Sequence, residues 1–267
     1  MEQPKNNLKI VADKKNARML LPNILTLIGV CIGLTSIRFA LSGEFHLAII
    51  AIIFAALIDG LDGRIARLIK GTSKVGKELD SLTDMISFGV APAFIMYFWK
   101  LNTLGRFGWL LCLIYVICVA LRLARFNISS NQEPSWKDNF FEGVPSPAGG
   151  ILVLTPLIIS LTGFNYIELN FDIITPVFFI ATSFLLISKF PSYSFKKIVI
   201  QRKATIFLLF SIILFFGLLL IYTFEVIAIS SIIYLAILPI SFFHYQKMKK
   251  IDENEKIQDD EDLEDEL

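Results

Sequence analysis

The sequence predicts an all-α polytopic membrane protein with about eight transmembrane helices. Hydrophobic residues make up 55% of its 267 residues, and Phe alone occurs 24 times. Charged residues are confined to the two ends and to short breaks between apolar stretches. Most of these stretches are close to the ~20 residues that a helix needs to cross a bilayer. This composition leaves no room for a large soluble domain.

The apolar stretches give the order of the expected helices. The first runs from Leu20 to Leu41 and lacks an Ala-x-Ala cleavage pattern, so we interpret it as a retained span that begins at Pro22-Asn23. A short fifth stretch, and a sixth that contains Pro176, are expected to tilt or kink. The seven later stretches lie at about 45–66, 77–99, 107–127, 147–163, 173–190, 204–222 and 225–244.

The distribution of basic residues predicts the topology. With the N terminus in the cytoplasm, most of the 25 basic residues fall on the cytoplasmic side, as the positive-inside rule requires. Only Arg38, Lys100 and Arg106 lie at or near the other side. We therefore expect a protein of the cell (inner) membrane with both termini in the cytoplasm.

The two ends differ in charge from the apolar middle. Residues 1–21 form a basic cytoplasmic segment, which is either a weakly amphipathic surface helix or a disordered tail. Residues 22–246 form the transmembrane domain. Residues 247–267 are expected to form an acidic, disordered cytoplasmic tail, because the part from Asp252 to Leu267 is strongly acidic and contains no aromatic residue.

Four aspartates stand where a lipid-facing sequence should have none. Asp59 and Asp62 are three residues apart and Asp80 and Asp84 are four apart, so each pair projects from one helix face. A charged residue near the bilayer centre costs roughly 2.5 to 3.5 kcal/mol. The polar segment 70–74 predicts a turn that brings the four carboxylates together. Two Mg²⁺ or Mn²⁺ ions, which prefer oxygen ligands, would neutralise this cluster and bind a diphosphate.

Small residues and one arginine accompany the carboxylates. Gly63 lies four residues after Asp59, and Gly76 lies four before Asp80. At both positions the missing side chain lets a ligand approach the backbone closely. Arg67 is a candidate for binding phosphate, because its guanidinium can donate two parallel hydrogen bonds.

The complete pattern is Asp-x2-Asp-Gly-x2-Ala-Arg-x8-Gly-x3-Asp-x3-Asp, which begins at Asp59 and resembles the signature of the CDP-alcohol phosphotransferase family. The resemblance implies the helical bundle of that family, a homodimer and two divalent cations, Mg²⁺ or Mn²⁺. It also implies that Asp84 acts as the general base. The implied metal ligands are Asp59, Asp62, Asp80 and Asp84. The residues implied to bind the CDP-lipid are Asp59, Gly63, Ala66, Arg67, Ser73 and Gly76.

Three further stretches resemble the phosphatidylserine synthase branch of this family, namely Ser87–Ala93, Arg122–Asn127 and Glu142–Gly150. This branch transfers the phosphatidyl group of CDP-diacylglycerol to the hydroxyl of L-serine and releases CMP, so the resemblance implies a phosphotransferase with these two substrates. The candidates for holding the serine are Arg122, Arg125 and Asn127. We expect the lipid bilayer as a partner, and no nucleic acid.

Two alternatives stay open. Another CDP-alcohol phosphotransferase, such as a phosphatidylglycerophosphate or phosphatidylinositol-phosphate synthase, would keep the four aspartates and change only the acceptor pocket. A cation transporter would instead use the same carboxylates as an ion path, and it would carry metal across the membrane without releasing CMP.

Overall fold

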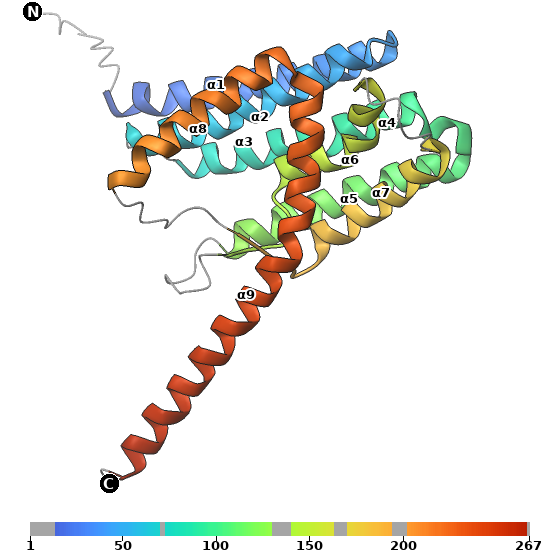
Figure 1. The fold of residues 1–267 in the computed structure, drawn as a ribbon. Helices are drawn as coiled ribbons and strands as arrows, with labels where there is room; N and C mark the ends of the chain where they lie inside the picture. Colours follow the sequence, from blue (N-terminus) through green and yellow to red (C-terminus); the bar gives the residue numbers. More distant parts are fainter. Residues whose placement is uncertain (1–13, 70–72, 130–139, 163–169, 194–201, 266–267) are drawn as a thin grey trace, which may run out of the picture.

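The computed structural model describes residues 14–69, 73–129, 140–162, 170–193 and 202–265, and nearly all of them are helical (Figure 1). The predicted all-α class is confirmed. The helices are α1 (Lys14–Leu41), α2 (Phe45–Leu68), α3 (Lys74–Asp84), the π-helical η1 (Met85–Val90), α4 (Ala91–Trp99), the 3-10 helix η2 (Leu101–Leu104), α5 (Arg106–Ser129), α6 (Ser146–Leu161), α7 (Phe171–Ile187), α8 (Arg202–Ile221) and α9 (Thr223–Asp265). The strands are β1 (Phe140–Glu142) and β2 (Pro191–Tyr193).

Five helical segments of the described chain are long and apolar enough to cross a membrane. They are Leu21–Leu41, Phe45–Leu68, Val75–Trp99, Arg106–Ile128 and Thr223–Lys249. Three shorter apolar helices, Ser146–Leu161, Phe171–Ile187 and Thr205–Ile221, accompany them. The protein is thus an integral membrane protein, and the number of eight spans stays a prediction.

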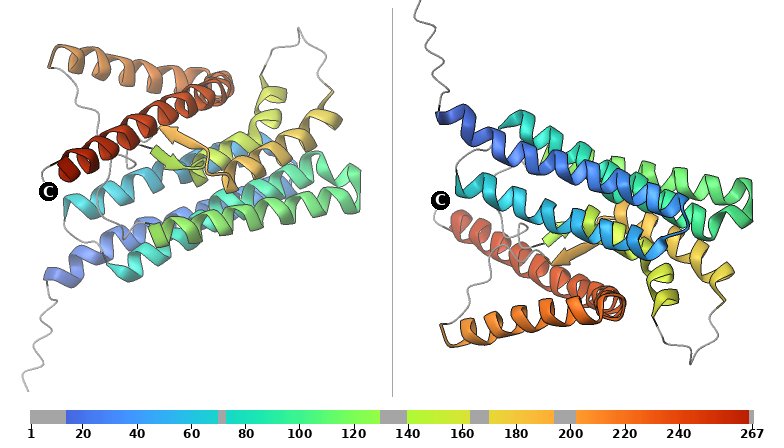
Figure 2. Two further views of the ribbon diagram at one scale, coloured as in Figure 1. Left: turned by 90° about the horizontal axis from the view of Figure 1, so that it is seen from below. Right: turned by 90° about the horizontal axis from the view of Figure 1, so that it is seen from above.

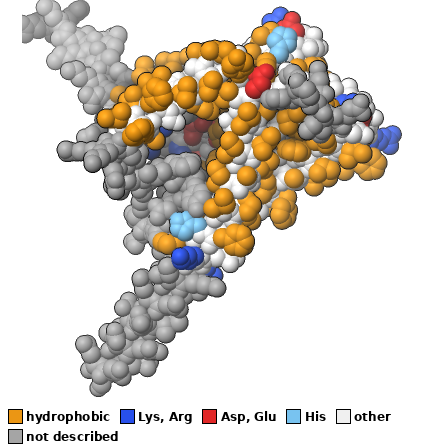
Figure 3. Space-filling view, viewed as in Figure 1, with side chains coloured by type: hydrophobic (Ala, Val, Ile, Leu, Met, Phe, Trp, Pro, Cys, Tyr) orange, Lys and Arg blue, Asp and Glu red, His pale blue; other side chains and the backbone are white. Residues whose placement is uncertain are grey.

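The helices form a bundle in which α1 and α2 pack as an antiparallel pair and α5 packs on α7. In both views of Figure 2, α8 and α9 lie together on one side of the bundle and α1 and α3 lie on the other. Figure 3 shows that hydrophobic side chains cover most of the described surface on the viewed face; some acidic side chains show within a hollow, and others lie at the surface near the upper end of the molecule. This distribution suits a lipid-facing exterior around a polar interior.

Small residues let α1 approach the helix that carries the second aspartate pair. A Cβ added at Gly29 would lie 3.3 Å from Thr83 Cγ2, and one at Gly33 would lie 2.5 Å from Ser87 Oγ. The Ser87 hydroxyl donates a hydrogen bond of 3.2 Å to the Gly29 carbonyl. Two glycines and two small hydroxyl residues, each pair four apart, therefore bring the two backbones together.

The segment that follows Asp84 is π-helical, and Pro92 changes the hydrogen bonding of its backbone. Pro92 has no amide hydrogen to donate to the Phe88 carbonyl four residues earlier. The buried Tyr115 of α5 donates to that carbonyl instead, at 2.8 Å. This hydrogen bond to α5 holds the segment that follows Asp84.

A short two-stranded sheet orients the start of α6. In it β1 pairs with β2 in antiparallel register, with Phe141 opposite Ser192. Gly143 follows at φ +77°, and a Cβ there would lie 2.9 Å from the Ser188 carbonyl. Its carbonyl accepts a hydrogen bond of 2.8 Å from the Ser192 hydroxyl. This sheet therefore sets the direction in which the chain enters α6.

Some residues named in the sequence predictions lie outside the described part of the chain. These are residues 1–13 and 70–72, which include most of the expected basic segment and most of the expected turn. Helix α9 runs through the acidic segment to Asp265, and Figure 1 shows this end projecting away from the other helices. The described side chains of α9 end at Lys249. The boundaries 1–21, 22–246 and 247–267 stay predictions.

Candidate active site

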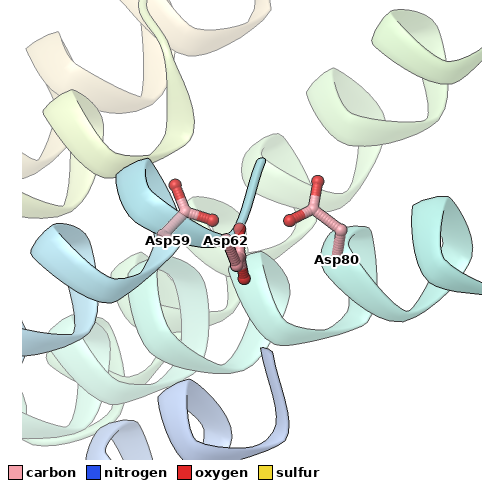
Figure 4. Close-up of side chains that lie close together, drawn as sticks. All are labelled: Asp59, Asp62 and Asp80. Carbon is pink, nitrogen blue, oxygen red and sulfur yellow. The ribbon is translucent and has the colours of Figure 1, made fainter. Parts of the chain in front are cut away.

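Three carboxylates from two helices converge within the bundle. Asp59 and Asp62 lie in the second half of α2, and Asp80 lies on α3. One oxygen of each lies within 4.8 Å of the other two. Figure 4 shows Asp59 and Asp80 on either side of one space, with Asp62 between them. Asp62 is 4% exposed, whereas the other two are partly buried.

The donor set of this cluster suits a hard divalent cation. Its three acids supply only oxygen atoms, and carboxylates so close together repel one another when ionised. Mg²⁺ and Mn²⁺ take oxygen ligands and would remove that repulsion. The chain can therefore hold the metal that the sequence predicts, whereas the choice of ion and the number of ions stay predictions.

Helix α1 supplies a residue that the sequence gives no reason to select. The Thr26 hydroxyl is buried and lies 2.9 Å from Asp62 Oδ2, to which it donates a hydrogen bond. Such a bond fixes the orientation of a carboxylate that could bind metal. Thr26 is 36 residues from Asp62, and nothing in its neighbouring sequence marks it as part of a site.

Asp84 stands next to the group of three. It is 9% exposed and lies close enough to Asp59 for the two carboxylates to interact. Its Oδ2 accepts a hydrogen bond of 2.7 Å from the Ser146 hydroxyl. Its Oδ1 is buried, and no described residue donates to it. One oxygen is thus held while the other is available to a metal or to a reacting hydroxyl.

The three acceptor candidates lie in different surroundings. Arg122 is 7% exposed, and its Nη1 donates 3.0 Å to Ser146 Oγ, which places it beside Asp84. Arg125 Nη1 donates 2.7 Å to the carbonyl of Ile187, at the end of α7. The Asn127 amide donates 2.9 Å to the Ser81 hydroxyl of α3. Among these three residues, Arg122 is joined by hydrogen bonds to an aspartate, through Ser146 to Asp84.

A cavity of ≈ 480 Å³ opens beside the carboxylates. Its lining residues are Pro22, Asn23, Thr26, Asp62, Gly63, Ala66, Ser73, Gly76, Lys77 and Asp80. Four of the residues expected to bind the CDP-lipid, Gly63, Ala66, Ser73 and Gly76, are therefore brought together. Arg67 is exposed, and its Nε donates 3.0 Å to the Gly63 carbonyl.

The cavity also meets the start of α3. Ser73 caps this helix, and its hydroxyl accepts a hydrogen bond of 2.9 Å from the Gly76 amide. Helix N-termini attract phosphate groups, because their first amides have no partner within the helix. The α1 residues Pro22 and Asn23 complete the lining, and the sequence pattern had not indicated them.

A second, apolar pocket of ≈ 280 Å³ lies between α2, α6, α8 and α9. Its lining residues are Ile53, Ala56, Leu57, Ala148, Ile151, Leu152, Phe215, Leu219, Ile227, Ser230, Ser231 and Tyr234. Ala56 is one helical turn before Asp59, so the pocket lies close to the carboxylates. Its lining suits hydrocarbon.

Comparison with known proteins adds an independent finding. A family model described as CDP-alcohol phosphatidyltransferase matches residues 19–243. Curated proteins called CDP-diacylglycerol–serine O-phosphatidyltransferase are similar to this chain. That of Mycobacterium leprae (strain TN) is 46% identical over 144 residues, which is 53% of this chain and 48% of the relative. That of Helicobacter pylori (strain ATCC 700392 / 26695) is 37% identical over 201 residues, or 75% and 83%.

A third relative of the same name, from Bacillus subtilis (strain 168), is 34% identical over 177 residues, which is 66% of this chain and 92% of the relative. The match thus spans about half the length of the mycobacterial relative and most of the length of the other two.

Proposed function

Because the chain belongs to the CDP-alcohol phosphatidyltransferase family, we propose that it transfers the phosphatidyl group of CDP-diacylglycerol to L-serine, giving phosphatidylserine and CMP. The main support for this type of reaction is that carboxylate oxygens of Asp59, Asp62 and Asp80 lie within 4.8 Å of one another, beside a cavity of ≈ 480 Å³. The choice of serine as acceptor rests on the names of the relatives and on the buried Arg122.

The aspartates would hold two divalent cations, Mg²⁺ or Mn²⁺. Asp59, Asp62 and Asp80 would be the main ligands, with Asp84 near the second ion. When bound, such ions neutralise a diphosphate and stabilise the charge that develops on the leaving group. Thr26 would keep the Asp62 carboxylate in its ligating orientation through its 2.9 Å hydrogen bond.

The cavity beside the carboxylates would hold the CDP moiety. Gly63 has no atom within 4 Å of an added Cβ, so the space over its backbone is open to a ligand. Ala66 and Gly76 would give clearance for the cytidine. Ser73, at the start of α3, and Arg67, on the outer side of α2, would contact phosphate oxygens.

The apolar pocket would receive part of a lipid chain. It is lined mainly by aliphatic and aromatic side chains of α2, α6, α8 and α9, and it begins one turn away from Asp59. A phosphorus atom held at the carboxylates would therefore leave the acyl chains next to hydrocarbon. The lipid would reach this position sideways from the bilayer.

Asp84 would act as the general base. Its Oδ1 has no donor among the described residues, so it can accept the proton of the serine hydroxyl. The serine oxygen then forms a bond to the phosphorus that bears diacylglycerol. The bond from that phosphorus to the bridging oxygen breaks, and CMP leaves with the electron pair. The proton stays on Asp84 until it is lost to water.

Arg122 would bind the serine carboxylate. It is buried beside Asp84, and its Nε makes no hydrogen bond to any described residue. A guanidinium edge binds a carboxylate through two parallel hydrogen bonds, which fits an amino-acid acceptor better than a polyol. In this arrangement the carboxylate is held on one side of the substrate and the hydroxyl points to the base.

The direct test is the incorporation of labelled serine into lipid. The purified full chain in detergent, supplied with CDP-diacylglycerol and Mn²⁺, should convert [¹⁴C]serine into a chloroform-soluble phospholipid with one CMP released per serine incorporated. Movement of Mn²⁺ into proteoliposomes without any CMP would instead favour a transporter.

We also propose a homodimer with both termini and the active site on the cytoplasmic side.

A further inference from the structure

Ser146 is the first residue of α6, and its hydroxyl joins two charged groups of the proposed site. It is 1% exposed. Its Oγ donates 2.7 Å to Asp84 Oδ2 and accepts 3.0 Å from Arg122 Nη1. Resting on the proposed function, we propose that Ser146 is a positioning residue that orients the base Asp84 and fixes it relative to Arg122.

The hydroxyl has one hydrogen, and its two contacts use it without conflict. Arg122 can only donate and an ionised Asp84 can only accept, so the hydroxyl must receive from the first and give to the second. This directional chain occupies Oδ2 of Asp84 and leaves Oδ1 without a donor among the described groups. The carboxylate is therefore held through one oxygen and reacts through the other.

The position of Ser146 is fixed by the packing of α6. Pro145 and Pro147 flank it and restrict the backbone at the start of the helix. A Cβ at Gly149 would lie 2.8 Å from Leu186 Cδ2, and one at Gly150 would lie 3.1 Å from Phe88 Cβ. The first turn of α6 is thus pressed between α7 and η1. Asp84 immediately precedes η1, so hydroxyl and carboxylate are held by neighbouring rigid segments.

The hydroxyl does not serve its own helix. The N-cap of α6 is Pro145, which has no side-chain capping bond, and Ser146 follows it as the first helical residue. Serines near a helix start usually cap that helix through a free amide. Here both contacts of Ser146 go instead to side chains of other helices, 62 and 24 residues away in the sequence.

A positioning role predicts a specific kinetic effect. In Ser146→Ala, both Asp84 Oδ2 and Arg122 Nη1 lose their partner, so the base can rotate. We expect kcat to fall about 10- to 100-fold, the equivalent of one hydrogen bond to a charged group. The KM for CDP-diacylglycerol should change by less than about twofold, because the nucleotide cavity is untouched.

The matched control is Ser36→Ala. Ser36 is also buried, at 0% exposed, but its hydroxyl donates only to the Gly33 carbonyl of its own helix, at 2.6 Å. This variant should keep the wild-type kcat. Mn²⁺ binding to the cluster of Asp59, Asp62 and Asp80, measured by electron paramagnetic resonance, should be the same in both variants, because these three ligands are intact.

A second pair of variants addresses the folding of the alanine variant. Ser146→Thr keeps the hydroxyl, whereas Ser146→Cys keeps the size but has only a weak donor. A higher kcat for the threonine variant than for the cysteine variant supports the proposal, and equal values overturn it. A Ser146→Ala enzyme with wild-type kcat also overturns it. If the wild-type protein itself transfers no serine, the proposed function fails rather than the role of Ser146.

Discussion

Replacing Asp80 by Asn should abolish turnover without harming the fold, and this follows from the charges of the cluster. The carboxylate oxygens lie within 4.8 Å of one another, and two ionised groups at that distance repel by about 3 kcal/mol at an effective dielectric constant of about 20. Asp80 forms two such pairs, with Asp59 and Asp62. In the metal-free protein, the amide therefore removes repulsion and stabilises the fold. With metal present, the amide removes a ligand.

The two effects have opposite signs, which makes the experiment informative. In EDTA, the melting temperature of Asp80→Asn should equal or exceed that of the wild type. Addition of Mn²⁺ should raise the melting temperature of the wild type, because binding to the native state stabilises it, and should leave the variant nearly unchanged. CMP release from CDP-diacylglycerol should fall by more than about 1,000-fold, since both the electrostatic and the orienting role are lost.

Asp172→Asn is the matched control. Asp172 is exposed and forms an ion pair of 3.0 Å with Lys100 at the far end of the bundle. An exposed pair contributes little to stability, so this variant should keep its activity and its response to Mn²⁺. Full activity in Asp80→Asn, or a wild-type melting temperature that does not change when Mn²⁺ is added, would refute the assignment of the aspartates as metal ligands.

Three further predictions concern the other parts of the site. Arg122→Lys should raise the KM for serine at least about 10-fold by removing the bidentate fork, whereas Arg125→Ala should change it less than about threefold; acceptor titrations measure both, and an unchanged KM in Arg122→Lys would remove Arg122 from the acceptor site. Thr26→Val should weaken Mn²⁺ binding about 10-fold, because Asp62 loses its orienting hydrogen bond. The affinity is measured by a paramagnetic resonance titration, and an unchanged affinity would rule out this role of Thr26. Gly63→Val should raise the KM for CDP-diacylglycerol about 10-fold without lowering the melting temperature, since no atom lies within 4 Å of a Cβ added at this position. An unchanged KM would exclude Gly63 from the nucleotide cavity.

The sequence predicts the local parts of this site well. The spacing of Asp59, Asp62 and Asp80 on two successive helices is enough to bring their carboxylates together, because helix periodicity fixes which residues share a face. Pro92 likewise reveals a carbonyl without a helical partner. These inferences need only neighbouring residues and the geometry of a helix.

Long-range partners could not be predicted in the same way. Thr26, Tyr115 and Ser146 each donate a hydrogen bond to a residue between 27 and 62 positions away. Nothing in a single sequence specifies which hydroxyl of another helix meets a given acceptor. Their positions depend on how closely α1, α5 and α6 pack, which is decided by glycines and prolines outside the aspartate pattern.

The choice among acceptor candidates also depended on packing. Arg122 and Arg125 are three residues apart and look equivalent in the sequence. In the structure one is buried against Ser146 and the other donates to the end of α7. A helix of fixed pitch places both near one face, but only the neighbouring helices determine which of them faces the carboxylates.

The most direct test of the central claim is CMP release by the purified full chain with CDP-diacylglycerol and Mn²⁺ or Mg²⁺, compared across L-serine, glycerol 3-phosphate, inositol and inositol phosphate. CMP should be released with L-serine alone, and none should be released in EDTA. Release with one of the other acceptors would contradict the assignment of serine and keep the family chemistry. The absence of release with all four would contradict the proposed reaction itself.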